Sequence, residues 1–360
     1  MTFEEARAAF PVLERLGFLN AGTNGPLPRA AGEAMVAQTL RDLAEGRAGA
    51  EYYTRVRELR ERVRAKLAAL IGAPTENLAL TTSTTNGCNI VLGALGLGPA
   101  DEVVTTDEEH FGLLGPLHTT GAQVRVAATR GLEPARALES LLAEVGPRTR
   151  LLALSHVSWV TGNVLPIAEL KRETGLPILV DGAQSGGAIE VEASLFDYYT
   201  VSGQKWPCGP DSTGALYVRD PESLRVSAPT YFSQEQFGPG GAFEPKPGSA
   251  RFDHGYIGAT LLAGLDASLE GAPPWRFERA RETAARCRAL LAARFDVVTA
   301  PDQATLVSFR PAGDPAETVQ RLADRGVVVR EIPGSGLVRV SCGYWTSEDD
   351  LERLLDGLAG

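Results

Sequence analysis

Cysteine is scarce in this chain of 360 residues, and no long apolar run occurs. The four cysteines are widely spaced, with no CxxC pair and no cluster of cysteine and histidine at metal-ligand spacing, so we expect no metal site. Their positions are Cys88, Cys208, Cys287 and Cys342. No apolar segment reaches the roughly 18 residues that cross a membrane, and the amino terminus, MTFEEARAAF, is polar and acidic. We therefore expect a cytoplasmic protein with reduced thiols and no membrane contact.

An excess of positive charge is also absent. The chain contains 35 lysine and arginine residues and 45 aspartate and glutamate residues, which gives a formal net charge of -10. Nucleic-acid binding depends on a clustered basic surface that neutralises phosphates, so we expect no nucleic-acid partner. The arginine-rich segment 55–66 is interleaved with Glu58 and Glu61, which is typical of a solvated helix face.

The length of the chain exceeds what one hydrophobic core usually supports, which predicts a large domain with a smaller one attached. From residue 78 onward, short apolar runs rich in β-branched residues alternate with segments of helical period. This alternation predicts an α/β fold, with a mainly parallel seven-stranded sheet covered by helices. The expected strands are residues 78–82, 102–106, 123–128, 150–154, 178–180, 198–202 and 214–218.

The stretch 229–258 interrupts this pattern and is rich in glycine, proline and phenylalanine, which indicates a long loop without regular structure. Such loops usually cover a site or reach a partner subunit, and we favour the second. Helical patterns at 259–269 and 275–294 precede a strand, helix, strand, strand and helix, which predict a small α+β domain. The expected divisions are an N-terminal segment packing with the small domain, 1–70, a large ligand-binding domain, 71–257, and a C-terminal small domain, 258–360.

Lysine is as scarce as cysteine, and most of the 35 basic residues are arginines, so the position of each lysine is more informative than that of an arginine. The lysines are Lys66, Lys171, Lys205 and Lys246. Lys205 lies just past an expected strand, at the carboxyl end where open α/β sheets place their ligands. A lysine there is most often solvated. A desolvated lysine, however, has a lowered pKa and can form a Schiff base with the aldehyde of pyridoxal phosphate (PLP).

Two further strand ends carry matching chemistry. Asp181 ends the apolar run 176–180 and could cap a helix, but a buried carboxylate there also suits the protonated pyridine nitrogen of PLP. The run 81–87, TTSTTNG, offers hydroxyls and free backbone N–H groups at a helix start, which suits a phosphate. It is neither a P-loop nor a GxGxxG dinucleotide turn.

Histidines follow two other strands. His110, in the segment DEEH, can lay its imidazole over an aromatic cofactor, although a lone histidine there is usually structural. His156 and Trp159 lie at the end of a fourth strand, which we also place on the cleft side. Four strand ends with complementary chemistry are less probable by chance than any one of them, so together they favour a PLP site.

These segments resemble the class V aminotransferase family of fold-type I PLP enzymes. The resemblance is strongest to the branch of cysteine desulfurases, C–S lyases and isopenicillin N epimerase-like proteins, and it runs along almost the whole chain. Its anchors are FLNAGTNGPLP (18–28), TTSTTNGCNIV, DEEH, SHVSWVTGNVLPI (155–167), LVDGAQS, SGQKW, RFDHG and LVRVSCGYWT.

The resemblance implies a role for each cofactor residue. Lys205 would carry PLP and shuttle protons, Asp181 would pair with the pyridine nitrogen, and Gln184 would contact the ring hydroxyl. His110 would stack on the ring. The expected phosphate ligands are Thr84, Thr85, Ser202 and Gln204.

The resemblance also implies an amino-acid substrate. Its carboxylate would bind Arg339 in a bidentate contact, with Asn20 and Trp159 nearby. On its strand, Arg339 could instead be part of a surface ion pair. Tyr256 stands where relatives have a threonine that reaches the phosphate of the partner subunit, and it can still donate one hydrogen bond to that phosphate.

Three other departures from the family pattern bear on reactivity. Gln204 replaces the usual histidine before the catalytic lysine, which keeps a phosphate donor and loses a titratable group. Trp159 stands where many relatives have an asparagine that contacts the cofactor, so binding of the ring hydroxyl would depend more on Gln184. Residues 326–338 contain no cysteine, whereas desulfurases place their sulfur acceptor there.

The implied reaction begins with removal of the substrate α-proton by Lys205. Transamination, β-elimination of the C–S lyase or desulfurase type, and racemisation all remain open, with persulfide formation ranked lower for want of the loop cysteine. A PLP-binding protein without turnover is disfavoured because Lys205, Asp181 and Arg339 are retained, and a nucleotide-dependent Rossmann enzyme because 81–87 lacks the glycine fingerprint. We also expect a homodimer with shared active sites, in which residues 243–256 cross the interface.

Overall fold

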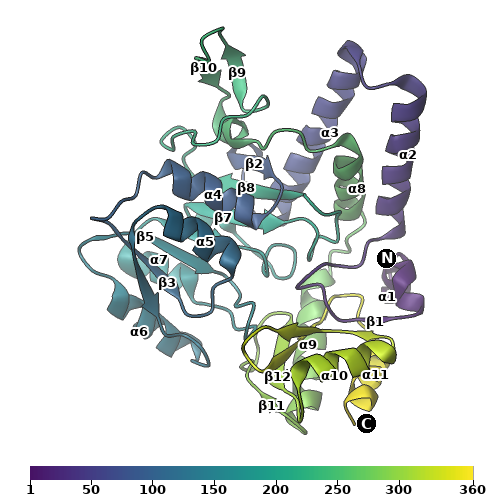
Figure 1. Cartoon of the computed structure of the whole chain (residues 1–360). Coiled ribbons are helices and arrows are strands. Elements are labelled where there is room, and N and C mark those ends of the chain that lie inside the picture. The colour runs from purple at the N-terminus through teal and green to yellow at the C-terminus, as the bar shows by residue number, and fades with distance from the viewer. Residues whose placement is uncertain (360) are drawn as a thin grey trace.

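The computed structural model describes residues 1–359 and shows a large central sheet with a smaller sheet domain beside it (Figure 1). The central sheet has seven strands in the order β2-β8-β7-β6-β5-β3-β4. Their bounds are β2 (Leu78–Thr81), β3 (Glu102–Thr106), β4 (Gln123–Ala127), β5 (Thr149–Ser155), β6 (Ile178–Asp181), β7 (Tyr198–Ser202) and β8 (Gly214–Val218). The α/β fold and the seven predicted strands are therefore confirmed.

Strand β8 runs antiparallel to both of its neighbours, β7 and β2, whereas the remaining pairs of the sheet are parallel. Antiparallel strands can be joined by a short connection, while parallel strands need a longer crossover. The chain accordingly returns from β7 to β8 through residues 203–213 without an intervening helix. This connection carries Lys205.

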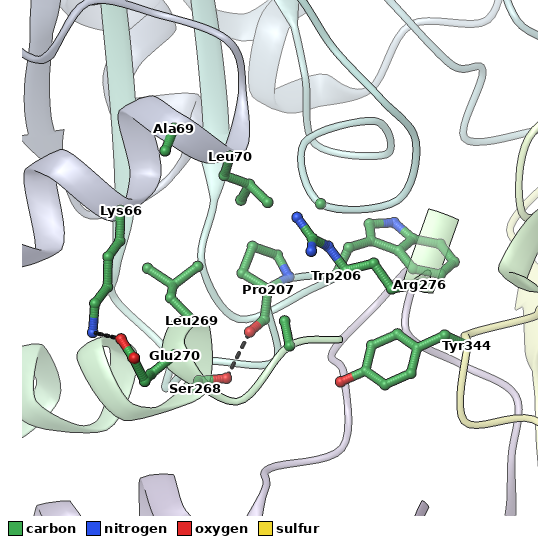
Figure 2. A pocket seen from close by; sticks show the side chains of 12 residues that line it. Lys66, Ala69, Leu70, Trp206, Pro207, Ser268, Leu269, Glu270, Arg276 and Tyr344 are labelled. Atoms are coloured by element: carbon green, nitrogen blue, oxygen red, sulfur yellow. Dashed lines mark hydrogen bonds and ion pairs between the residues drawn. The ribbon is translucent and has the colours of Figure 1, made fainter. Parts of the chain in front are cut away.

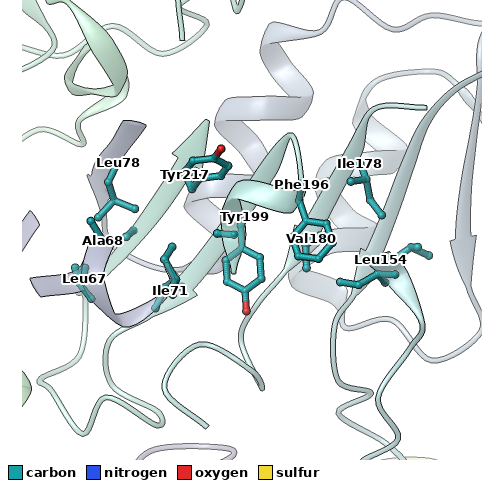
Figure 3. Close-up of a cluster of buried hydrophobic side chains, with 14 of the residues drawn as sticks. Leu67, Ala68, Ile71, Leu78, Leu154, Ile178, Val180, Phe196, Tyr199 and Tyr217 are labelled. Atoms are coloured by element: carbon teal, nitrogen blue, oxygen red, sulfur yellow. The ribbon is translucent and has the colours of Figure 1, made fainter. Parts of the chain in front are cut away.

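Helices cover both faces of the sheet because alternate residues of a buried strand point to opposite sides. Leu78 packs in one cluster with Val180 and Tyr199 (Figure 3), while the adjacent Ala79 packs with Val91 in the other. Burying one such leucine or valine side chain stabilises the fold by about 1.5–3 kcal/mol. The connecting helices are α4 (Thr84–Ala94), α5 (Phe111–Thr119), α6 (Pro134–Glu144) and α7 (Ile167–Thr174).

The small domain is built on a four-stranded antiparallel sheet in the order β11-β12-β15-β14. These strands are β11 (Asp296–Val297), β12 (Leu306–Arg310), β15 (Leu337–Ser341) and β14 (Arg330–Ile332). Its helices are α9 (Arg276–Ala292), α10 (Pro315–Asp324) and α11 (Glu348–Ala359). Strand β1 (Gly17–Phe18), from the other end of the chain, pairs in parallel with β13 (Val327–Val328).

The N-terminal segment packs against both domains. Phe10, which follows α1 (Phe3–Ala8), lies in a buried cluster with Trp345 of the small domain. In contrast, α2 (Arg29–Glu45) and α3 (Gly49–Leu70) lie alongside α8 (Ala259–Glu270) (Figure 1). Leu67 of α3 and Leu262 of α8 both belong to the core of the central sheet. The sequence predicted that residues 1–70 and α8 pack with the small domain. Phe10 and β1 contact that domain, whereas the apolar faces of α3 and α8 are buried against the large sheet.

Residues 229–258 contain regular structure, so the prediction of an irregular loop is wrong. Strands β9 (Gln234–Phe237) and β10 (Phe243–Pro245) form an antiparallel hairpin that projects from the body (Figure 1), followed by a 3-10 helix, Gly248–Phe252. Gly241, with φ of 80°, adopts the left-handed backbone that a tight turn requires. No helix among the described residues is long and apolar enough to span a bilayer.

Candidate active site

A cavity of about 170 Å³ lies where the carboxyl ends of the central strands face the small domain. Parallel strands bring their carboxyl ends to one edge of a sheet, which explains why side chains distant in the sequence meet there. The lining residues are Gly22, Thr23, Ser83, Thr84, Thr85, His110, Trp159, Ala183, Gln184, Ser202, Gln204, Lys205, Arg330 and Arg339. The structure thus brings most of the predicted site residues together in one cavity.

Lys205 has a pKa lowered to about 8, chiefly because burial disfavours its charged form. The charge of Asp181 opposes this shift, whereas the charges of Arg339 and Arg330 reinforce it. A lysine with this pKa is partly neutral near pH 7, so its Nζ can accept a proton or attack an aldehyde.

The turn that carries Lys205 is held by its own backbone. Gly203 N donates to Thr213 O (2.8 Å), and Gly209 N donates to Gly203 O (2.8 Å). Gly25 N donates to Gln204 O (2.8 Å), and a Cβ on Gly25 would meet Lys205 O at 2.2 Å. The backbone of the N-terminal segment therefore packs directly against the lysine turn. This close approach requires glycine at position 25, because any side chain there would collide with the turn.

The lysine turn is also supported from behind. Figure 2 shows Trp206 and Pro207 on the wall of a separate cavity of about 260 Å³, together with Arg276 and Tyr344. Ser268 Oγ of α8 donates a hydrogen bond to Pro207 O (2.7 Å), which ties the turn to the helix. The position of Lys205 is thus fixed by packing on two sides.

Gln184 is held in place at both ends of its amide. Its Nε2 donates to Gly22 O (2.8 Å), and its Oε1 accepts from Trp206 Nε1 (3.1 Å). Nε2 keeps a second hydrogen that no residue takes up in these contacts. That hydrogen is the donor that the predicted contact with a ring hydroxyl requires.

Asp181 ends β6 and is only 3% exposed, behind the residues that line the cavity. Its Oδ1 accepts a hydrogen bond from Ala183 N (2.9 Å). Its charge acts on Lys205. A buried carboxylate this close to the cavity suits a cationic ring nitrogen, since burial of a charge is costly without a partner.

The start of α4 offers polar groups to the cavity. Ser83 Oγ accepts from Asn86 N (3.1 Å) and caps the helix. Thr84 N donates to Ser202 Oγ (3.4 Å), which links the helix start to the end of β7. Gln204 Oε1 is buried without a hydrogen-bond partner in the described structure. A helix start with hydroxyls suits a phosphate group, to which Gln204 would donate through Nε2 and not through the acceptor Oε1.

His110 caps α5, because its Nδ1 accepts from Gly112 N (3.0 Å). Burial lowers its pKa, and so does the charge of Lys205, so its imidazole is neutral near pH 7. Its ring meets that of Trp159 edge to face, with 5.1 Å between centroids. Trp159 Nε1 is buried without a partner, which leaves an N–H group for a ligand.

Arg339 of β15 is 1% exposed and has Arg330 of β14 as its direct cross-strand neighbour. Sequence reasoning missed Arg330, as well as Gly22, Thr23 and Ala183, whereas Ser83 belongs to the run 81–87 that was expected to bind a phosphate. Arg330 directly follows the apolar run 327–329, but nothing in that segment indicates its pairing with Arg339. The backbone contact of Gly22 and the side-chain contacts of Thr23 leave no signal in the sequence either.

Besides Asp181, which lies behind the lining, three predicted or suggested residues lie outside the cavity. Asn20 lies one layer back, where its Oδ1 accepts from Thr23 Oγ1 (2.8 Å). Tyr256 is 66% exposed and packs on Phe232, so any contact of Tyr256 with a cofactor would be to that of another subunit. His156 was placed on the cleft side, but its ring packs against aromatic residues on the opposite side, and it lines a different cavity.

The four cysteines all lie within the described residues, where each is free and buried, and none of them lines this cavity. Burial strongly raises the pKa of Cys208, below the lysine turn, and Cys342 belongs to the core of the small domain. A thiol with a raised pKa is a poor nucleophile. Among the described residues, no group of His, Cys, Asp and Glu side chains is arranged to hold a metal ion.

The family model described as aminotransferase class V matches residues 18–354. The chain belongs to the class V aminotransferase family. It is a PLP enzyme of fold type I, and the residues present fit that cofactor. A lysine of lowered pKa and a polar helix start meet in one cavity, and a buried carboxylate lies behind its lining.

Particular relatives are similar over nearly the full length. Isopenicillin N epimerase of Streptomyces clavuligerus is 32% identical over 99% of this chain and 97% of its own. A probable cysteine desulfurase of Xylella fastidiosa is 28% identical over 99% of this chain and 94% of its own. A structure of the cystine C–S lyase C-DES in complex with cysteine persulfide has a TM-score of 0.89 at 29% identity, covering 97% of this chain and 99% of that one. A C-DES variant with glycine covalently linked to PLP has a TM-score of 0.90 at 28% identity, covering 98% of both chains.

Proposed function

We propose that this PLP enzyme is a C–S lyase, which removes the α-proton of an amino acid and eliminates the sulfur substituent at Cβ. The observation that carries the proposal is Lys205, a base with a pKa of about 8 that lines the cavity together with the buried Arg339. When bound, PLP supplies the electron sink for the charge left at Cα. The likeness to C-DES over the whole chain supports lyase chemistry.

Different residues of the site bind the substrate, transfer the proton and hold the cofactor in this proposed reaction. Arg339 holds the α-carboxylate of the substrate, which places Cα near Lys205. Lys205 Nζ takes the proton from Cα as a general base. The Cβ–S bond then breaks, its electron pair leaves on sulfur, and the protonated Nζ supplies the proton that sulfur needs. Asp181, Gln184 and His110 hold the cofactor.

The cysteines favour a lyase over a persulfide-forming desulfurase. A desulfurase transfers sulfur to a thiol of the enzyme, and no thiol lines the cavity in residues 1–359. The sulfur product therefore leaves as a small molecule. Transamination is the second candidate because the same Lys205 could return the proton to the cofactor, and epimerisation is the third because of the epimerase relatives.

The test is a panel of amino acids, including cystine and cysteine, supplied to the purified PLP-loaded protein. We expect keto acid, ammonia and a reduced sulfur product in equal amounts. Keto acid that forms only with an acceptor keto acid present would establish transamination instead. Racemised substrate without keto acid would establish epimerisation.

We further propose that the protein is a homodimer whose interface includes the β9–β10 hairpin and residues 243–256. Three aromatic side chains in this region are strongly exposed: Tyr231 at 68%, Phe237 at 67% and Tyr256 at 66%. Exposed aromatic groups that gather in one region are typical of protein interfaces. In such a dimer, Tyr256 would reach the cofactor phosphate of the partner subunit.

A further inference from the structure

Two arginines face the cavity from neighbouring antiparallel strands. Arg330 of β14 and Arg339 of β15 are direct register partners, which puts their side chains on the same face of the sheet. Like charges in directly opposite positions destabilise a sheet. The charges of both arginines lower the pKa of Lys205, which lines the same cavity. Such a pair calls for anionic charge between or beside the two side chains.

The protein itself supplies no such charge. Arg339 Nη1 donates to Trp159 O (2.9 Å), and Arg339 Nη2 and Arg330 Nη1 both donate to Thr23 Oγ1 (3.4 and 3.0 Å). These acceptors are neutral, and Arg339 Nε is buried with no partner among the described residues. Burial and, to a lesser extent, the charge of Arg330 lower the pKa of Arg339 to about 9. No acidic residue opposes this shift. The hydroxyl of Thr23 holds the two guanidinium groups in place without neutralising either.

A monocarboxylic amino acid brings one negative charge to two guanidinium groups. The polar groups that suit the cofactor phosphate, around Thr84 and Ser202, come from the large domain, whereas the arginines come from the small domain. We propose that Arg330 is the specificity residue for a second anionic group, so that the enzyme prefers amino acids with an acidic group in the side chain or in the departing sulfur fragment. This inference rests on the proposed function, since it assigns the α-carboxylate to Arg339.

Binding of two matched acids to the holoenzyme tests the inference without turnover. Succinate and butyrate have the same four-carbon chain and differ in the second carboxylate. By titration calorimetry, we expect succinate to bind about tenfold to a hundredfold more tightly, the range for a buried charged contact. Arg330→Gln should bring succinate close to butyrate, while Arg339→Gln should weaken both acids. Arg310→Gln, on an exposed arginine of the same domain, should change neither.

Equal binding of the two acids to the unchanged protein would overturn the proposal. Equal weakening of both acids in Arg330→Gln would also overturn it, because the two arginines would then share one carboxylate. Arg330→Lys retains the charge and guards against a folding defect. We expect part of the preference for succinate to survive in this variant, and its complete loss despite an unchanged melting temperature would count against a role for the charge.

Exchange of the α-hydrogen in deuterium oxide separates this inference from the proposed function. Aspartate and asparagine form one matched pair of amino acids, and glutamate and glutamine form another. We expect faster exchange for the acidic member of each pair. Equal exchange rates would disprove only the second anion site, whereas no exchange with any amino acid in the panel would disprove the proposed function.

Discussion

The indole Nε1 of Trp206 donates a hydrogen bond of 3.1 Å to Oε1 of Gln184, so the residue after the lysine orients the amide proposed to contact the cofactor. Trp206→Phe removes this donor and keeps most of the apolar volume. A lost hydrogen bond of this kind costs about 1 kcal/mol. We expect PLP to bind several-fold more weakly, as measured by titration of the cofactor-free protein. Trp275→Phe, in which an indole bonded to Met1 O is replaced, should leave the affinity for PLP unchanged.

Replacing Lys205 by alanine should abolish covalent attachment of PLP and reduce the rate of α-hydrogen removal about 100- to 10,000-fold, the usual contribution of a positioned base. Reduction with borohydride followed by peptide mapping should locate the cofactor on residue 205 of the unchanged protein. Lys246→Ala, at a lysine outside the cavity, is the matched control. Label found on Lys246 or another lysine would contradict the assignment of the site.

Glu109 predicts a pH dependence of stability. Burial raises its pKa to about 7, although the hydroxyl of Thr106 and the hydroxyl and N–H of Ser155 all donate to it. A raised carboxyl pKa stabilises the fold at low pH, and this contribution is lost as pH rises from about 4.5 to about 7. The loss amounts to about 3 kcal/mol.

Chemical denaturation across this pH range measures the effect. Compared with Glu109→Gln, the unchanged protein should lose stability between pH 4.5 and pH 7. Glu139→Gln, at an exposed position, should preserve the slope of the unchanged protein. Parallel stability curves for the unchanged protein and Glu109→Gln would show that Glu109 does not titrate in this range.

Asp253 is a centre of stability in the large domain. It is 1% exposed and pairs with Arg60 (2.9 Å) and Arg64 (2.8 Å) of α3. Removing one partner of a buried ion pair leaves an uncompensated charge, so Asp253→Asn should lower the free energy of unfolding by about 3–5 kcal/mol. Glu139→Gln breaks only an exposed pair and should cost less than about 1 kcal/mol. Similar losses in the two variants, measured by urea denaturation, would contradict this account.

The proposed dimer predicts that a change at Tyr256, which lies outside the cavity of its own subunit, weakens cofactor binding. Tyr256→Ala should weaken PLP binding, because the residue reaches the phosphate in the partner subunit, and should favour dissociation at low protein concentration. Sedimentation at several concentrations and titration with PLP measure the two effects. A protein that sediments as a monomer at all concentrations would refute the dimer and the role of Tyr256 together.

Strand ends were the part of the site that the sequence could predict. Asp181 ends an apolar run and Lys205 lies three residues past the end of β7, and parallel strands carry such residues to one edge. Arg330 was missed because its importance comes from its pairing with Arg339 across two strands, which no local pattern records. Thr23 was missed because it acts through contacts with residues some 300 positions away.

The fold was predictable to a similar depth. Buried strands of the large sheet are continuous apolar runs bounded by polar residues, so their limits could be predicted closely. The packing of α3 and α8 could not, because an amphipathic helix shows which face is buried but not what covers it. The β9–β10 hairpin was hidden by its glycine and proline content, which is also typical of irregular loops.

The pairing of β1 with β13 sets an order of events during synthesis of the protein. Gly17 is translated 310 residues before its strand partner, Val327. The contacts of Thr23 with Arg330 and Arg339 likewise require residues that are translated some 300 positions later. A nascent chain that has already made Lys205 therefore completes the cavity only when Arg330 and Arg339 follow, so secure capture of the vitamin B6 cofactor has to await the strands of the small domain.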